Sequence, residues 1–62
     1  MKKPSVKLIG ENGNTMNLLS ICTRALKRDG QAEKARELTQ KIFNAASYKD
    51  ALKILGEYVN IK

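Results

Sequence analysis

The chain has 62 residues, among them 12 Lys and Arg, 6 Asp and Glu, one Cys and neither His nor Trp, so its net charge is +6. A chain this short builds only a small core, and one Cys without any His supplies neither an internal disulfide nor the ligand set of a structural zinc. We therefore expect a single small domain over residues 1–62 that is not an enzyme, holds no cofactor or metal and takes no small-molecule substrate.

The sequence predicts neither a membrane segment nor a signal peptide. No run approaches the ~18 apolar residues that a membrane helix needs. The basic start, Met1–Lys7, is followed by Glu11, Asn12 and Asn14 instead of the apolar stretch that a signal peptide requires. We therefore expect a cytoplasmic protein that does not contact a membrane.

The first predicted element is a short strand over residues 5–9, preceded by a flexible arm over residues 1–4. The strand is indicated by a run of β-prone residues that begins after a proline. Residues 10–14 are rich in Gly and Asn, which tolerate positive φ, so they predict a turn. Asn14 or Thr15 would then cap a helix, because a short side-chain oxygen accepts from a free amide of the first turn.

Three helices are predicted from the spacing of apolar residues and from their capping residues. The first runs from about Thr15 to about Arg28 and ends at Gly30, which suits a left-handed conformation. The second runs over about Gln31–Ala46, and the third, capped by Ser47, over about Tyr48–Glu57. The residues expected to face inward follow i, i+3, i+4 spacing: Met16, Leu19, Cys22, Ala25, Leu26, Ala32, Ala35, Leu38, Ile42, Ala45, Tyr48, Ala51, Leu52, Leu55 and Tyr58.

A β-prone tail, Val59–Ile61, follows the third helix. A lone strand at each end of a helical chain has no hairpin partner, and isolated strand edges are a liability. We therefore predict that Val6–Ile9 pairs with Tyr58–Ile61. This gives a helix-dominated α+β fold of order β-α-α-α-β, with the short terminal strands paired against a three-helix core. Parallel and antiparallel pairing both remain open.

Three segments give the chain a recognisable layout. It opens with a V-K-L-x-G-x-x-G-N pattern at Val6–Asn14, carries a basic run at Arg24–Arg28 and closes with Tyr58–Ile61. In this layout the chain resembles a group of small uncharacterised proteins of bacteria, their prophages and other mobile elements. The resemblance implies a recurring small bacterial domain. Since the group has no established activity, the resemblance implies no functional residue.

Features that could suggest catalysis have simpler explanations. Gly10–Gly13 precede a helix N-terminus, where anions bind, but they lack the Gly-Lys-Ser/Thr ending of a P-loop and are expected to form a plain turn. Cys22 lies on the apolar stripe of the first helix without any His to activate it, so we expect a core residue. The acidic residues fall on polar faces or turns, as Glu37 does beside Lys41, and we expect them to be solvated.

Arg24, Lys27 and Arg28 form a basic cluster. Three further lysines extend it: Lys2, Lys3 and Lys7. Such cations can contact the phosphates of a nucleic acid, so the cluster is the candidate nucleic-acid contact. Two observations weigh against this function. Basic residues in a last helical turn also complement the helix dipole, and no aromatic residue lies among them to stack on a base.

Four apolar residues lie beside the inward stripes: Leu18, Ile21, Phe43 and Ile54. Surplus apolar residues either wrap a common core or bury themselves in a partner. For so short a chain, a second copy or another protein would extend a small core. Our first hypothesis is therefore a small binding or accessory protein, encoded on a mobile element, that meets a protein partner or itself through these residues. Nucleic-acid binding is the alternative.

Overall fold

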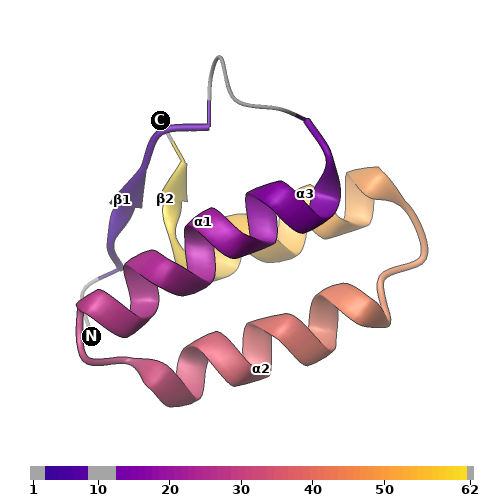
Figure 1. Cartoon of the computed structure of the whole chain (residues 1–62). Coiled ribbons are helices and arrows are strands. Elements are labelled where there is room, and N and C mark those ends of the chain that lie inside the picture. Colours follow the sequence, from indigo (N-terminus) through magenta and orange to yellow (C-terminus); the bar gives the residue numbers. More distant parts are fainter. Residues whose placement is uncertain (1–2, 9–12, 62) are drawn as a thin grey trace.

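The chain folds in the order β-α-α-α-β, as seen in a computed structural model that describes residues 3–8 and 13–61 (Figure 1). The elements are β1 (Ser5–Val6), α1 (Thr15–Arg28), α2 (Ala32–Phe43), α3 (Tyr48–Tyr58) and β2 (Asn60–Ile61). The predicted helix-dominated α+β class and the order of the elements are confirmed. None of the helices within these two ranges has both the length and the apolar character needed to cross a bilayer.

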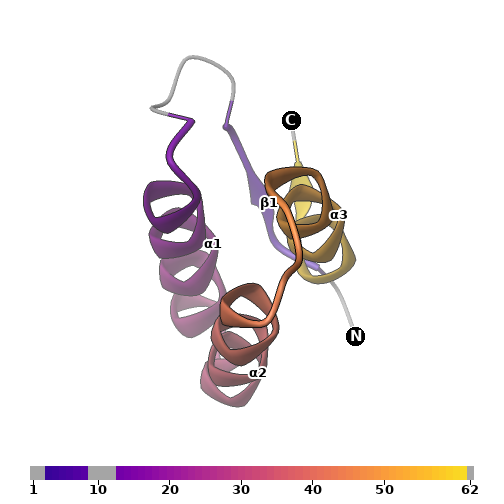
Figure 2. The ribbon, with the colours of Figure 1, turned by 90° about the vertical axis from the view of Figure 1, so that its right-hand side faces the viewer.

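The three helices and the sheet surround one core. Viewed nearly along the helix axes, α1 and α3 lie on either side, α2 lies below them, and β1 lies between α1 and α3 on the side away from α2 (Figure 2). β1 packs on α1, and β2 packs on α3. The buried residues of the core are Val6, Leu18, Leu19, Cys22, Ala25, Leu26, Ala35, Leu38, Ile42, Ala51, Leu55, Tyr58 and Val59.

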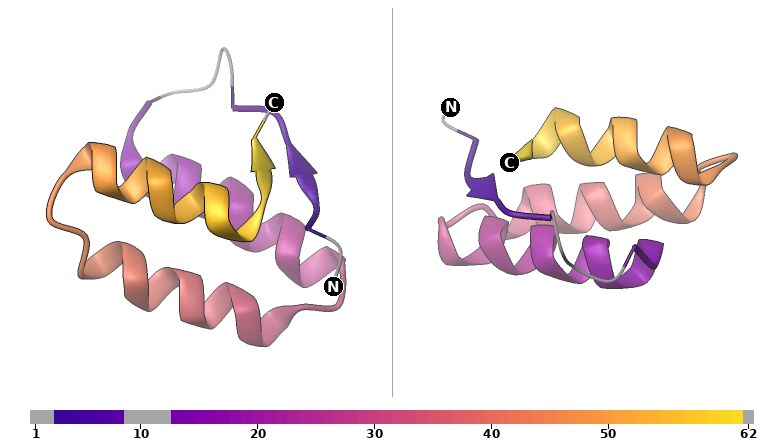
Figure 3. Two further views of the ribbon diagram at one scale, coloured as in Figure 1. Left: turned by 180° about the vertical axis from the view of Figure 1, so that it is seen from behind. Right: turned by 90° about the horizontal axis from the view of Figure 1, so that it is seen from above.

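The sheet is parallel and shorter than the predicted pairing. Ser5 pairs with Asn60, and Val6 pairs with Ile61; Figure 3 shows the two strands side by side from behind. A parallel pair needs a long crossover connection, which the three helices supply. Ile9, the last residue of the predicted first strand, lies outside the described residues.

The described end of the predicted flexible arm is attached to the C-terminal part of the chain. The Lys3 ammonium donates to the Gly56 carbonyl at 3.0 Å. The Asn60 amide donates to the Pro4 carbonyl at 2.8 Å. Residues 1–2 of the arm lie outside the described residues. The hydrogen bonds of Lys3 and Pro4 thus extend the contact between β1 and β2 backwards along the chain.

Both ends of α1 lie at the predicted residues, because each end is set by a local capping interaction. The Asn14 Oδ1 atom accepts from the Met16 amide at 2.8 Å, which makes Asn14 the N-cap. At the other end Gly30 has φ 77°. The Gln31 amide donates to the Leu26 carbonyl at 2.8 Å, and the Gly30 amide donates to the Lys27 carbonyl at 3.1 Å. These two bonds define a Schellman motif.

The second helix is shorter than predicted. It ends at Phe43 instead of Ala46, because Asn44 caps it with both its backbone amide and its side chain. The Asn44 side-chain amide donates to the Gln40 carbonyl at 3.0 Å. The Ser47 hydroxyl then accepts from the Asp50 amide at 3.2 Å, which confirms the predicted cap of α3. α3 itself continues to Tyr58, one residue beyond the prediction.

Three residues predicted to face inward are exposed instead: Met16, Ala32 and Tyr48. Each lies in the first turn of its helix. The apolar spacing continues to the end of each helix, but the core does not extend to these first turns. Periodicity identifies the face of a helix, whereas the packing of its neighbours decides how much of that face is buried.

Candidate anion-binding surface

The positive charge of the chain is concentrated on α1. This helix carries Arg24, Lys27 and Arg28 and no acidic residue. The other two helices mix both signs of charge, with Glu33 and Glu37 on α2 and two further acidic residues on α3. Of the three helices, α1 therefore has the most strongly basic exposed surface.

Basic residues from two elements meet beside α1. A hollow of about 240 Å³ lies between the β1 segment and α1 and is lined by Ser5, Val6, Lys7, Ile21, Arg24, Ala25 and Arg28. Arg24 and Arg28 are one helical turn apart and so lie on the same side of the helix. Lys7 directly follows Val6, whose side chain is buried, and alternation along an extended chain turns Lys7 outwards. We call Lys7, Arg24 and Arg28 the basic hollow.

The charges of the basic hollow are not neutralised within the described part of the chain. Both ion pairs found there are on α2, where Glu37 lies 3.8 Å from Lys34 and 3.8 Å from Lys41. Lys7, Arg24 and Arg28 are exposed. The hollow can therefore offer its full positive charge to an anion from solution, with Val6 and Ile21 as an apolar wall.

The structure divides the basic cluster that the sequence predicts. Arg24 and Arg28 line the hollow, whereas Lys27 is exposed on α1 outside the lining. Lys7 joins them through the packing of β1 on α1. Lys2 lies outside the described residues, and Lys3 lines a different hollow. The sequence signal for Lys7 is its outward position in a strand, but only the tertiary structure places it beside α1.

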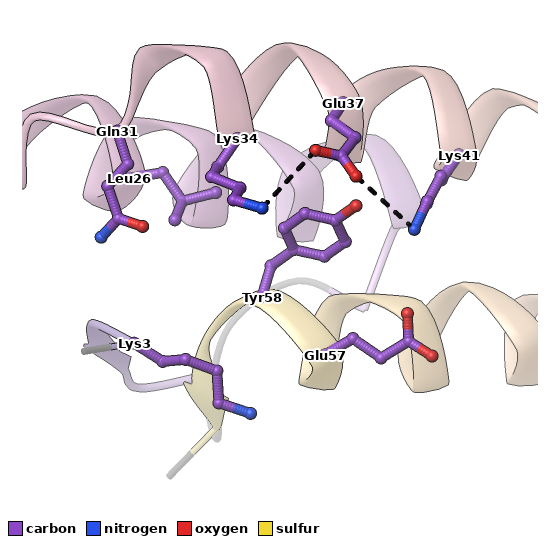
Figure 4. Close-up of a pocket in the computed structure, with 8 residues that line it drawn as sticks. All are labelled: Lys3, Leu26, Gln31, Lys34, Glu37, Lys41, Glu57 and Tyr58. Atoms are coloured by element: carbon purple, nitrogen blue, oxygen red, sulfur yellow. Dashed lines mark ion pairs between the residues drawn. The ribbon is translucent and has the colours of Figure 1, made fainter. Parts of the chain in front are cut away.

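A second hollow, of about 550 Å³, lies between α2 and α3 around Tyr58. Figure 4 shows Glu37 between Lys34 and Lys41, with the Tyr58 hydroxyl pointing towards them and Lys3 and Glu57 on the opposite side. The Lys41 Nζ atom lies 5.1 Å from the centre of the Tyr58 ring. The sequence predicts the Glu37–Lys41 pair and the burial of Tyr58, but it does not predict their contact.

The charges of this second hollow largely offset one another. A hydrogen bond with the Tyr58 hydroxyl, assisted by the charges of Lys34 and Lys41 and opposed by desolvation, lowers the pKa of Glu37. A hydrogen bond with Tyr58 is also the largest cause of the raised pKa of Lys41, followed by the charges of Tyr58, Glu37 and Glu57. This hollow thus holds a self-compensating network and is a weaker anion site than the basic hollow.

The four apolar residues predicted as a protein interface do not share one surface. Leu18 is only 3% exposed and belongs to the core. Ile21 and Ile54 are half-buried and pack against that core. Phe43 alone is well exposed, at 66%. Burial of Leu18 in the chain's own core leaves it no surface to offer a partner, because three crossing helices need broad apolar faces.

Phe43 instead shares one end of the helix bundle with two residues that were predicted to be buried. Met16 is 53% exposed and Tyr48 is 48% exposed. Met16 lies at the start of α1, Phe43 at the end of α2 and Tyr48 at the start of α3, and these three helix ends lie on the same side of the molecule (Figure 1). A Cβ atom on Gly13 would lie 3.4 Å from the Tyr48 hydroxyl, so Tyr48 lies against the segment that enters α1. We call Met16, Phe43 and Tyr48 the apolar end.

Cys22, the predicted turn at residues 10–13 and metal binding are the remaining candidates from the sequence. Cys22 lies fully buried in the core as predicted, and burial raises the pKa of its thiol to about 11, which keeps it in the unreactive protonated form. Of the predicted turn Gly10–Gly13, residues 10–12 lie outside the described residues. Across residues 3–8 and 13–61, no group of three or more Cys, Asp or Glu side chains is placed to hold a metal ion.

The chain was compared with protein-family models, with curated proteins and with solved structures. None of the three comparisons finds a match. The resemblance to small bacterial and prophage proteins therefore stays a prediction from the sequence, and the surfaces described above are the basis for the function proposed below.

Proposed function

We propose that the protein is a small non-enzymatic binding protein whose ligand is a nucleic acid, held by its phosphates at the basic hollow. The observation that carries the proposal is the convergence of Lys7, Arg24 and Arg28, from two separate elements, on one hollow without a carboxylate. Arginine suits this ligand because its planar guanidinium makes paired hydrogen bonds with phosphate oxygens.

The helix dipole does not account for this arrangement. Only Lys27 and Arg28 lie in the last turn of α1, where a cation complements the dipole. Arg24 precedes that turn, and Lys7 belongs to a different element. A ligand with negative charge accounts for all of these positions together, including Lys27, which lies close enough on α1 to reach a neighbouring phosphate.

The experiment is fluorescence anisotropy with a labelled nucleic acid across a salt series. Three phosphate contacts predict a slope of log K against log [salt] of about −2.7 for duplex DNA, and a fourth contact from Lys27 predicts about −3.6. The double variant Arg24→Gln with Arg28→Gln should reduce the slope to about −0.9 if Lys7 is the one remaining phosphate contact, or to about −1.8 if Lys27 also contacts a phosphate.

A matched control is available on α3. Lys49 and Lys53 are also exposed and also one helical turn apart, so Lys49→Gln with Lys53→Gln removes the same net charge from another surface. The control should bind nearly as the unaltered protein does. Equal losses in the two double variants would show that net charge alone drives binding and would refute the proposed site. Unaltered helical circular dichroism in both variants excludes unfolding as the cause.

A second function is favoured by the apolar end. Large exposed apolar side chains that gather on a small protein are typical of an interaction surface, and the partner we propose is a second copy of the chain. Phe43→Asp should then lower the mass measured by light scattering to that of a monomer while the helical content stays unchanged. A monomeric mass for the unaltered protein at high concentration would refute this second function.

A further inference from the structure

We infer that α1 is the helix that enters the major groove of duplex DNA, with Arg24 contacting guanine and its neighbours contacting phosphates on either side. This inference rests on the proposed function and names its ligand more closely. On duplex DNA, Lys27 takes the place of Arg24 as the third phosphate contact, beside Lys7 and Arg28, and Arg24 is free to contact a base. α3 is a poorer candidate for this role. The exposed residues of α3, among them Asp50 and Glu57, would oppose phosphates.

The outward face of α1 is basic. The residues exposed along its last three turns are Ser20, Arg24, Lys27 and Arg28, and the helix has no acidic residue. Ser20 is small, and the Thr23 hydroxyl is already donated to the Ser20 carbonyl at 3.2 Å. The small Ser20 side chain lets this part of the face approach the bases closely, while the longer cations reach outwards.

The cations are spread around the axis of α1 across its exposed face. Consecutive residues of a helix are separated by about 100°, so Lys27 and Arg28 point to opposite edges of the exposed face, and Arg24 lies between them one turn earlier. Lys7 adds a cation at the edge that carries Arg28, because both line the basic hollow. Two flanking cations and one central arginine match a groove whose walls are phosphates and whose floor carries bases.

α1 is accessible to a large ligand. α1 lies at the outside of the bundle, with α3 behind it and α2 below it (Figure 1), and no described element covers its front (Figures 1 and 2). Its 14 residues span about 21 Å, and a helix about 10–12 Å across fits the major groove of B-DNA, which is about 12 Å wide. The major groove of an RNA duplex is too deep and narrow to admit the helix in this way.

The central position gives Arg24 a specific role. In the major groove guanine presents two acceptors, O6 and N7, and arginine binds both with one guanidinium. Such a contact discriminates against the wrong base by roughly 5- to 150-fold. Arg28, at the edge of the face, would contact phosphate and would bind every sequence alike.

The test compares duplexes of equal length and charge by anisotropy at one salt concentration. The probes are an alternating dG–dC duplex, the same duplex with 7-deazaguanine, which lacks the N7 acceptor, an alternating dA–dT duplex and an RNA duplex. We expect the dG–dC duplex to bind at least about fivefold tighter than the other three. Arg24→Gln should abolish this preference, whereas Arg28→Gln, with the same loss of charge, should weaken binding to every duplex and keep the preference.

The outcomes separate this inference from the proposed function. Equal binding of the dG–dC, 7-deazaguanine and RNA duplexes, still steep in salt, would overturn the groove assignment and leave phosphate binding standing. A preference that survives Arg24→Gln would overturn the role of Arg24. Absence of binding to all the duplexes and to single strands at low salt would overturn the inference and the proposed function together.

Discussion

Gly30 is the residue whose replacement tests the structure most directly. Its φ of 77° lies in the left-handed region, and a Cβ atom there would have no heavy atom within 4 Å beyond its chain neighbours. Gly30→Ala therefore introduces no clash, and its effect is purely conformational. The left-handed conformation costs an L-residue about 1–2 kcal/mol, while the loss of unfolded-state entropy returns about 0.4–1 kcal/mol. The net loss of stability is about 1 kcal/mol.

Gly56→Ala is the matched control for Gly30→Ala. Gly56 lies inside α3 without a positive φ, and its Cβ would meet the Ile61 Cδ1 atom at 3.9 Å, an ordinary contact. Alanine is favoured over glycine in a helix interior by about 0.8–1 kcal/mol, so Gly56→Ala should stabilise the protein. The same Gly→Ala change should thus lower stability at position 30 and raise it at position 56.

The assay is thermal unfolding followed by circular dichroism. For a domain of this size about 1 kcal/mol corresponds to about 4–8 °C in Tm, so Gly30→Ala should lower Tm by several degrees and Gly56→Ala should raise it by a similar amount. A rise in Tm for Gly30→Ala would refute the Schellman motif at the end of α1. A fall for Gly56→Ala would refute the open packing between α3 and β2.

Three further predictions concern the core and the titrating groups. Leu38 is fully buried, so Leu38→Ala should lower the free energy of unfolding, measured in urea, by about 2–5 kcal/mol. Phe43 is exposed in the single chain, so Phe43→Ala should change that free energy by less than about 0.5 kcal/mol at protein concentrations too low for two copies to associate. Equal effects would place Phe43 in the core. Burial raises the pKa of Cys22 from 9.0 to about 11, so the folded protein keeps the thiol proton to a higher pH than the unfolded chain does. The free energy of unfolding should therefore fall as pH rises from about 9 to about 11. Cys22→Ala should remove this part of the fall, and an unchanged pH dependence in that variant would contradict the burial of the thiol. The Tyr58 hydroxyl lowers the pKa of Glu37, so the small stabilisation by the Glu37 carboxylate, present above its unfolded pKa, should be lost as pH falls through its folded pKa. Glu37→Gln should therefore reduce the fall in the free energy of unfolding at acid pH. A larger fall in that variant would refute the contact with Tyr58.

Helix ends could be predicted where capping residues close in the sequence define them. Asn14 and Gly30 bound α1 by interactions within a few residues, and both ends of that helix were predicted correctly. The end of α2 was not, because alanines after Asn44 continue the apolar pattern while the Asn44 side chain closes the helix. Exposure of Met16 and Tyr48 depends on how the three helices pack together, and the periodicity of one helix does not contain that information.

The candidate site could be predicted only in part for the same reason. Arg24 and Arg28 share a helix face, which their spacing shows. Their meeting with Lys7 depends on the pairing of β1 with β2 and on the packing of β1 against α1, both of which join residues far apart in the chain. The direction of that pairing does not follow from the composition of two short strands.

The parallel sheet has a consequence for the order of folding. Lys3, which precedes β1, accepts at its carbonyl a hydrogen bond from the side-chain amide of Asn60 in β2, and the two residues are separated by 57 positions. Closing so large a loop costs more entropy than forming a helix, because each helix forms from local contacts. The helices can therefore form before the two ends of the chain meet. Pairing of β1 with β2 helps to hold the segment that carries Lys7 against α1, so the proposed phosphate site depends on contacts between the two ends of the chain.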